Sequence, residues 1–493
     1  MMNLLTALIY PVLLGFLVLS VMLRGISIRY RFLFYLGASF PTGAGLCSLI
    51  LFTAYVVLPA GAKQISLIAG FFIGAVLLGY RFFHLQKDLR RSGFFWPSAL
   101  NIEKSLFLQA LPSGLALLLF AYTLVTVIQF YTLSAPMDVF VYGGGDARFI
   151  WALKAKFLFR APETWLNMFS SKIFWSNTDY PLLLSGMLAW GWNWLGRESP
   201  LWAPLVYLGF YLSCSWILVW YLSLRISPAS GWIGGTLFLV LMPYLQNSVR
   251  QFADVPVTFF ITACGLTLAA ALRSNQGKLF AVSGLLGGLA AWTKNDGVLF
   301  VGWIYVLVGA ICVLRCLGRS KDPFASLRWF TLGAFLPLLA AGALKFFPET
   351  HGVYLGSGVL QKYLRNDPSP LITGWPRIFT IFKAFYLEMS RPDKWKGLWG
   401  FFILAVIAIG IRKEKPRGDY PWILFGIVIL VNAGYVAIFY ITRYNLIWHL
   451  RSTLDRLVLH SGLLALAFCF EGLGAFSPKF ARPDPGSQEK ISP

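Results

Sequence analysis

The chain has 493 residues, of which 57% are hydrophobic and 17% aromatic, and its mean hydropathy is +0.67. This composition excludes an ordinary soluble domain and predicts an all-α integral membrane protein. The net charge of +22 does not indicate a nucleic-acid partner, because the basic residues gather in short loops between apolar runs, as they do in membrane proteins.

About thirteen apolar segments have the length and composition of transmembrane helices. The first one is expected to be a retained span, because no basic segment precedes it and no small-residue cleavage site follows it. The segments are expected near residues 4–23, 33–58, 64–81, 106–133, 201–222, 231–248, 255–273, 279–293, 296–314, 329–347, 397–411, 420–441 and 457–475.

One further apolar segment, residues 181–195, decides the topology. It is short for a span, and its residues Trp190, Trp192 and Trp194 suit a helix that lies in the membrane interface. If it spans, every later loop changes sides. If it is interfacial, the positive-inside rule is met by four basic loops, which lie near residues 24–31, 81–91, 315–328 and 412–417. We therefore expect an exoplasmic N-terminus and a cytoplasmic C-terminus.

Three isolated acids each lie at the end of an apolar segment: Asp146, Asp179 and Asp254. A charge within a membrane helix costs about 2.5–3.5 kcal/mol on insertion scales, so acids kept near spans are candidates for function. The topology above places all three on the exoplasmic side. For each of them the alternative is a helix N-cap, with Asp146 also paired to Arg148.

Basic residues are expected on the same side. Lys294 stands where two apolar runs meet and is predicted to bind an anion; the alternatives are neutralisation by Asp296 and contact with lipid headgroups. The last exoplasmic turn is predicted to clamp a phosphate, or otherwise to contact headgroups. Its candidate residues are Arg443, His449, Arg451 and Arg456.

Other polar groups give weaker signals. The six cysteines lack the spacing of a zinc site, and Gly143–Gly145 is not a phosphate-binding loop, which disfavours an ATP-driven pump. His84 and His460 are expected to be structural, and the sequence assigns no role to His351. No metal ligands are predicted. The sequence neither indicates nor excludes the binding of a divalent metal.

The order of these parts resembles the GT-C superfamily of membrane glycosyltransferases, which includes protein mannosyltransferases and the aminoarabinose transferase of lipid A. The resemblance covers about residues 106–475. It rests on the acid Asp146 in a long first loop, the Ala253-Asp254-Val255-Pro256 turn, the Thr293-Lys294 turn and the stretch from Trp448-His449 to Asp455-Arg456. Many relatives carry two adjacent acids in the first loop, whereas Asp146 is followed by Ala147 and Arg148.

The resemblance implies a division of the chain into additional N-terminal helices (1–105), a catalytic module (106–347, with its first exoplasmic loop at 134–200), an exoplasmic loop with C-terminal helices (348–475) and a cytoplasmic tail (476–493). It also implies an inverting transfer of a sugar from a polyprenyl-phosphate donor to a glycan, lipid or protein acceptor at the exoplasmic face of the cell membrane. Asp146 would be the base, and Lys294 with Arg451 or Arg456 would stabilise the phosphate. Asp254 and Asp179 would orient either the acceptor or the neighbours of Asp146.

A secondary transporter or a flippase for lipid-linked glycans is the alternative function. Such a protein is expected to carry its acids at mid-membrane in broken helices, with internal repeats. The sequence shows no internal repeat, and its acids lie at the ends of the segments.

Overall fold

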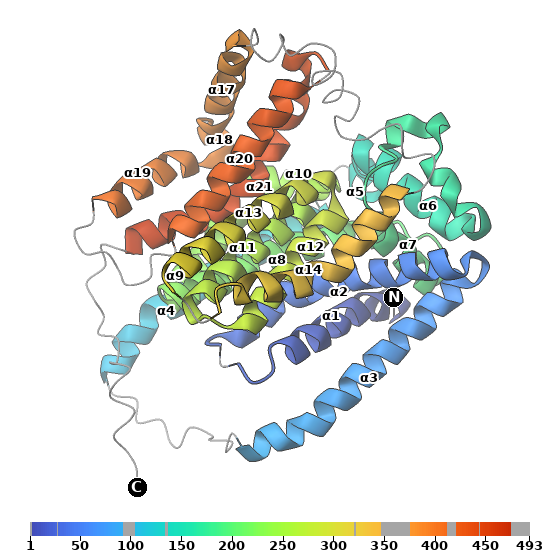
Figure 1. Ribbon diagram of the computed structural model, residues 1–493, viewed down its shortest axis with the longest axis horizontal. Coiled ribbons are helices and arrows are strands. Elements are labelled where there is room, and N and C mark those ends of the chain that lie inside the picture. The colour runs from blue at the N-terminus through green and yellow to red at the C-terminus, as the bar shows by residue number, and fades with distance from the viewer. Residues whose placement is uncertain are drawn as a thin grey trace.

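The computed structural model describes residues 2–26, 28–91, 104–133, 137–319, 322–346, 375–411, 421–442 and 444–474, and within these ranges the regular elements are all helices. The N-terminal helices α1 to α3 lie along one side of a central group formed by α8 to α14, and α17 to α21 lie along the other (Figure 1). The first helices are α1 (Met2–Met22), α2 (Arg31–Val57), η1 (Pro59–Gly61), α3 (Ala62–Arg91) and α4 (Lys104–Leu133).

Short helices make up the segment predicted as the first loop. They are α5 (Met137–Tyr142), η2 (Ala147–Ala152), α6 (Leu153–Arg160), η3 (Pro162–Phe169), η4 (Ser171–Ser176) and α7 (Leu183–Leu195). The central helices are α8 (Trp202–Arg225), α9 (Pro228–Leu239), α10 (Met242–Val249), α11 (Asp254–Ser274), α12 (Gly277–Thr293), α13 (Asn295–Leu317), α14 (Ala325–Ala343) and η5 (Leu344–Phe346). The last are α17 (Trp375–Met389), α18 (Pro392–Trp395), α19 (Leu398–Gly410), α20 (Pro421–Ile441) and α21 (Leu446–Gly474).

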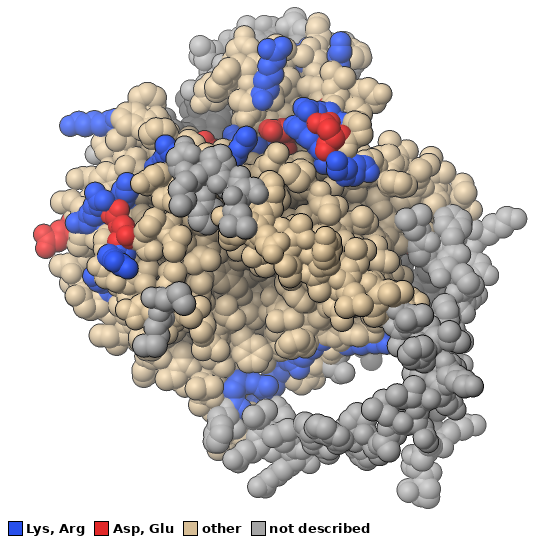
Figure 2. All heavy atoms as spheres, turned by 180° about the vertical axis from the view of Figure 1, so that it is seen from behind, with Lys and Arg blue, Asp and Glu red and all other residues tan. Residues whose placement is uncertain are grey.

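The described residues contain ten helices that are long and apolar enough to cross a membrane, or eleven if α9 and α10, bent by 57° at their junction, form one span. The protein is therefore a multi-pass membrane protein. Two further predicted spans, 279–293 and 397–411, correspond to the shorter helices α12 and α19, so the number thirteen stays a prediction. Figure 2 shows a broad face without charged side chains, with Lys, Arg, Asp and Glu gathered near its margins.

Helix α11 is the centre of the bundle. Residues 254–272 of α11 are all buried. The helix packs between α8, α12 and α21. It runs from Asp254 to Ser274, a length of about 30 Å at 1.5 Å per residue. We call its two ends the Asp254 end and the Ser274 end.

Three of the predicted basic loops lie at or next to the Ser274 end. Lys278 Nζ donates to the carbonyl of Arg24 at 2.5 Å, and Arg24 in turn donates to Tyr80 of α3 at 2.9 Å. Arg315 Nη2 donates to Asn275 Oδ1 at 3.2 Å. Three of the four basic loops thus lie together, as the interfacial assignment of 181–195 requires; the fourth, 412–417, lies outside the described residues.

Residues 183–195 form the 13-residue helix α7, but two of its three tryptophans contact protein and not the membrane interface. Trp190 and Trp192 are buried by protein, and Trp190 stacks on Tyr10 of α1 at a centroid distance of 5.5 Å. Helix α7 packs mainly on α2 and α6. These two indoles therefore bind the short helix to the bundle, because their faces are used in protein contacts.

Candidate functional site

The glycine-rich loop brings Asp146 to the Asp254 end. Gly144 N–H donates to the carbonyl of Arg250 at 2.8 Å, which joins this loop to the α10–α11 turn. Gly143 has a φ of +69°, and a Cβ there would lie 2.5 Å from the Ala147 Cβ and 3.0 Å from the Arg250 carbonyl oxygen. The run of glycines is explained by this close approach of two backbones.

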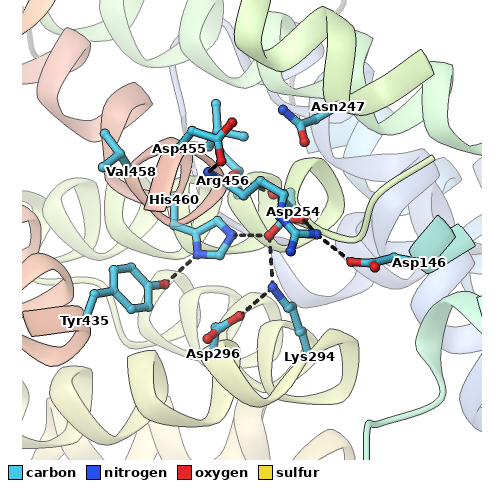
Figure 3. Close-up of polar contacts among 12 residues, drawn as sticks. Asp146, Asn247, Asp254, Lys294, Asp296, Tyr435, Asp455, Arg456, Val458 and His460 are labelled. Atoms are coloured by element: carbon cyan, nitrogen blue, oxygen red, sulfur yellow. Dashed lines mark hydrogen bonds and ion pairs between the residues drawn. The ribbon is translucent and has the colours of Figure 1, made fainter. Parts of the chain in front are cut away.

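Buried ion pairs surround Asp254, the first residue of α11. Lys294 Nζ lies 2.9 Å from Asp254 Oδ1 and 2.8 Å from Asp296 Oδ2 (Figure 3). Lys294 occupies the break between α12 and α13, where its extended backbone ends one helix and starts the next. The predicted pairing of Lys294 with Asp296 is present, and Asp254 shares the same ammonium group.

Arg456 of α21 bridges the two candidate acids. Its Nη1 lies 2.5 Å from Asp146 Oδ2 and 3.7 Å from Asp254 Oδ2. The side chain of Asp146 is 41% exposed, whereas that of Asp254 is 2% exposed. The guanidinium also lies over the ring of Phe252, 5.0 Å from its centroid. Asp146 is thus the accessible carboxylate of the site, held by an arginine that also contacts the buried one.

His460, expected to be structural, belongs to this cluster. Its Nε2 lies 3.3 Å from Asp254 Oδ1, and the Tyr435 hydroxyl lies 2.5 Å from its Nδ1 (Figure 3). His460 is four residues after Arg456, so one face of α21 presents both side chains to Asp254. This spacing was the signal that could have found it.

Asp179 lies in a second polar group next to the first. Asn295 Nδ2 donates to Asp179 Oδ2 at 2.6 Å, and Asn295 follows Lys294 in the chain. Lys345 donates to the Asp179 carbonyl at 2.5 Å and to Asn295 Oδ1 at 3.2 Å. Lys345 was not a sequence candidate, although it is a cation at the end of the predicted span 329–347.

A buried lysine, Lys154 of α6, supports the same region. Its ammonium donates to the carbonyls of Asn177 at 2.6 Å and Tyr180 at 3.3 Å. Burial lowers the pKa of Lys154 to about 7, although the carboxylate of Asp179 opposes that shift. Lys154 thus fixes the turn that carries Asp179, and it was also missed from the sequence.

Electrostatics distinguish Lys294 from Lys154. Burial acts to lower the pKa of Lys294, but the carboxylates of Asp254 and Asp296 outweigh it, so the pKa is raised above that of an ordinary lysine. Lys294 is therefore a fixed cation at neutral pH. With three carboxylates (Asp146, Asp254 and Asp296) and two cations (Lys294 and Arg456), the cluster carries a formal charge of −1 when His460 is neutral.

The structure separates the predicted phosphate clamp. Arg451 is exposed, and the ring of His449 packs among Phe439, Tyr444 and Trp448. Arg443 and His351 lie outside the described residues. Of the three predicted clamp residues that the structure describes, Arg456 is the one that contacts the acids.

The N-cap alternatives for the three aspartates are wrong. Helix η2 has no side-chain cap bond from Asp146, and Arg148 donates to the carbonyl of Gly143. Helix α7 begins after Leu182 rather than at Asp179, and the N-cap of α11 is Ala253. Each carboxylate is used instead in a contact with a distant segment.

Comparison of the chain with protein-family models, with curated proteins and with solved structures gives no match. Among the described residues, no three side chains of His, Cys, Asp or Glu are grouped as a metal site.

Proposed function

We propose that the protein is an inverting glycosyltransferase that moves a sugar from a polyprenyl-phosphate donor to an acceptor, with its site at the exoplasmic face of the membrane. The observation that carries this proposal is the Asp146–Arg456 ion pair. It places a partly exposed carboxylate and a cation side by side at the end of the bundle, over the buried Asp254–Lys294 pair.

The proposed reaction uses the two partners separately. The donor phosphate displaces Asp146 from Arg456, because guanidinium groups bind phosphate through two parallel hydrogen bonds. The freed Asp146 carboxylate then accepts the proton of an acceptor hydroxyl. The acceptor oxygen bonds to the anomeric carbon from the face opposite the phosphate as the sugar–phosphate bond breaks, which releases polyprenyl phosphate and inverts the anomeric centre.

Lys294, Asp254 and His460 have supporting roles in this proposal. Asp254 contacts Arg456, Lys294 and His460, so it fixes the cations before the donor arrives. Fixed charges in a water-poor site stabilise a developing phosphate charge more than mobile charges in water. Asp179, held by Asn295, positions the adjoining loop.

An apolar pocket supports a lipid-linked donor. It has a volume of about 710 Å³, lies between α17, α19 and α20, and includes Phe382, Ile403 and Val436 in its lining. Tyr435, which contacts His460, is adjacent to Val436 on α20. An isoprenoid chain in this pocket would bring its phosphate to the same end of the bundle.

Replacement of the proposed base tests this function. We expect Asp146→Asn to lower transfer by about 10²–10⁴-fold, the usual contribution of a general base, in proteoliposomes supplied with radiolabelled polyprenyl-phospho-sugars and envelope glycans or lipids. Glu198→Gln, which alters the surface ion pair with Arg160, is the matched control and should leave the rate unchanged. Transfer at the wild-type rate in Asp146→Asn would contradict the assignment.

A secondary transporter or flippase is the second candidate. The 57° bend between α9 and α10 favours it, because transporters build their sites from broken helices. In that case the label would cross the bilayer while the donor stays intact.

A further inference from the structure

A polar pocket lies at the Ser274 end, where the α11–α12 and α13–α14 turns meet. It has a volume of about 510 Å³, and its lining includes Arg273, Asn275, Arg315 and Trp329. It stands about 30 Å from Asp254, the length of α11, and so is separate from the site described above.

The charge of Arg315 is available inside this pocket. Arg315 Nη1 donates to the Ser326 hydroxyl at 2.5 Å, and Nη2 donates to Asn275 Oδ1 at 3.2 Å. Both partners are neutral, so they orient the guanidinium without cancelling its charge. Among the described lining residues the one acid is Asp322, which is paired with Arg328. Arg273 adds a second, exposed guanidinium.

Two helices also start at the pocket. Gly277 begins α12, and the first turn of α14 contains Ser326; neither helix has a side-chain cap at its N-terminus. A Cβ at residue 277 would lie 2.3 Å from Trp329 Nε1, so glycine lets the indole lie against this helix start. The unpaired N–H groups of helix N-termini add to the arginines in favouring an anion.

The apolar surface beside the pocket indicates the source of that anion. Trp329, Leu332 and Leu336 share one face of α14 and are 40%, 65% and 66% exposed. Tryptophan is favoured at the headgroup level of membranes, and exposed leucines beyond it suit acyl chains. A free phosphate would use the arginines but leave this face unused.

We propose that this pocket binds the phosphodiester headgroup of an anionic phospholipid, with Arg273 and Arg315 on the phosphate and the acyl chains along Trp329, Leu332 and Leu336. Basic pockets between transmembrane helices are suited to such headgroups, since the lipid surface concentrates anions there. This proposal does not depend on the proposed transfer reaction.

Native mass spectrometry of the detergent-purified full chain tests it with three probes: dioleoyl-phosphatidylglycerol, dioleoyl-phosphatidylcholine and inorganic phosphate. We expect phosphatidylglycerol to bind at least about tenfold more tightly than phosphatidylcholine, and inorganic phosphate to bind more weakly than either. Arg273→Glu and Arg315→Lys should each weaken binding of phosphatidylglycerol by about tenfold, because each removes charge-assisted hydrogen bonds. The control is Arg391→Ala, which should bind as the wild type does. Arg391 is exposed and lies three residues before Lys394, which pairs with Asp455 next to Arg456.

The exposed position of Arg273 keeps the test valid if Arg315→Lys fails to fold. Equal binding of the two lipids, or unchanged affinity for phosphatidylglycerol in Arg273→Glu, would overturn the proposal. Binding of inorganic phosphate as tight as that of phosphatidylglycerol would overturn the lipid assignment and leave an anion site of another kind.

Discussion

The two ends of α21 each hold a buried ion pair, and the two pairs differ in ways that separate function from stability. Near its C-terminal end, Glu471 Oε1 accepts from Arg225 Nε at 2.6 Å and from the Tyr221 hydroxyl at 2.8 Å. The side chain of Glu471 is 3% exposed and that of Arg225 is 12% exposed. The two opposite charges balance. Near its N-terminal end, Arg456 and Lys294 meet three carboxylates, and Asp146 is 41% exposed.

The difference shows that burial of a charge in a membrane protein does not by itself indicate a site. The Glu471–Arg225 pair joins α8 to α21 and leaves its charges balanced and enclosed. The cluster at Asp254 has unequal charges and one accessible partner, so an incoming phosphate and hydroxyl can replace existing contacts. We therefore expect substitutions in the Glu471–Arg225 pair to affect folding, and substitutions in the cluster at Asp254 to affect activity.

The largest stability effect is expected at the enclosed pair. Glu471→Leu removes the acid and leaves the Arg225 charge buried, which typically costs about 3–5 kcal/mol. Thermal denaturation in detergent measures this loss, with Glu471→Gln as an intermediate variant that still offers an acceptor oxygen. The transfer rate per folded molecule should be unchanged; a lower rate at full stability would break the comparison.

Arg456→Ala is expected to affect the donor more than the acceptor. Loss of its charge-assisted hydrogen bonds to the phosphate should raise the KM for the donor by about 10–100-fold, with a smaller change for the acceptor. Arg456→Lys should recover part of the loss, because an ammonium restores the charge without the two parallel bonds. Arg160→Ala at the surface pair is the control; equal losses for donor and acceptor would argue against a phosphate role.

The lowered pKa of Lys154 predicts that the stability of the protein depends on pH. Its pKa is about 7 in the folded protein, below its ordinary value of 10.5. Between these values the unfolded chain holds more protons, so stability should rise as the pH increases from about 7 towards 10, by up to about 1.4 kcal/mol per pH unit. Lys154→Met should remove this slope, as measured by melting temperature against pH. Parallel curves for the two proteins would contradict a lowered pKa.

The sequence predicted much of the helical arrangement because apolar length and basic loops are local signals. Twelve of the predicted spans each correspond to one principal helix, and the span 231–248 covers the two helices α9 and α10. Asp146, Asp254, Lys294 and Arg456 meet at one end of the bundle. The partners within the site were harder to predict, since Arg456 and Asp146 are 310 residues apart. Arg451 and Arg456 also look equivalent in sequence, yet five residues rotate them by about 140° around the helix, so only one of them faces the acids.

His460, Lys345 and Lys154 were missed for a related physical reason. Each is a single polar residue whose role depends on which buried group the folded chain places opposite it. For His460 that group is Asp254, and for Lys345 and Lys154 it is the backbone around Asp179. The spacing of His460 from Arg456 was a signal in the sequence, whereas the sequence around Lys345 and Lys154 does not indicate their partners.

The central claim is that the cluster at the Asp254 end transfers a sugar. The most direct measurement follows a doubly labelled polyprenyl-phospho-sugar, with one label in the sugar and one in the lipid, in proteoliposomes that contain the wild-type protein and acceptor lipids or glycans. The account predicts that the sugar label enters the acceptor with inverted configuration while the lipid label is recovered as polyprenyl phosphate. Recovery of both labels in an intact donor on the opposite leaflet would contradict it.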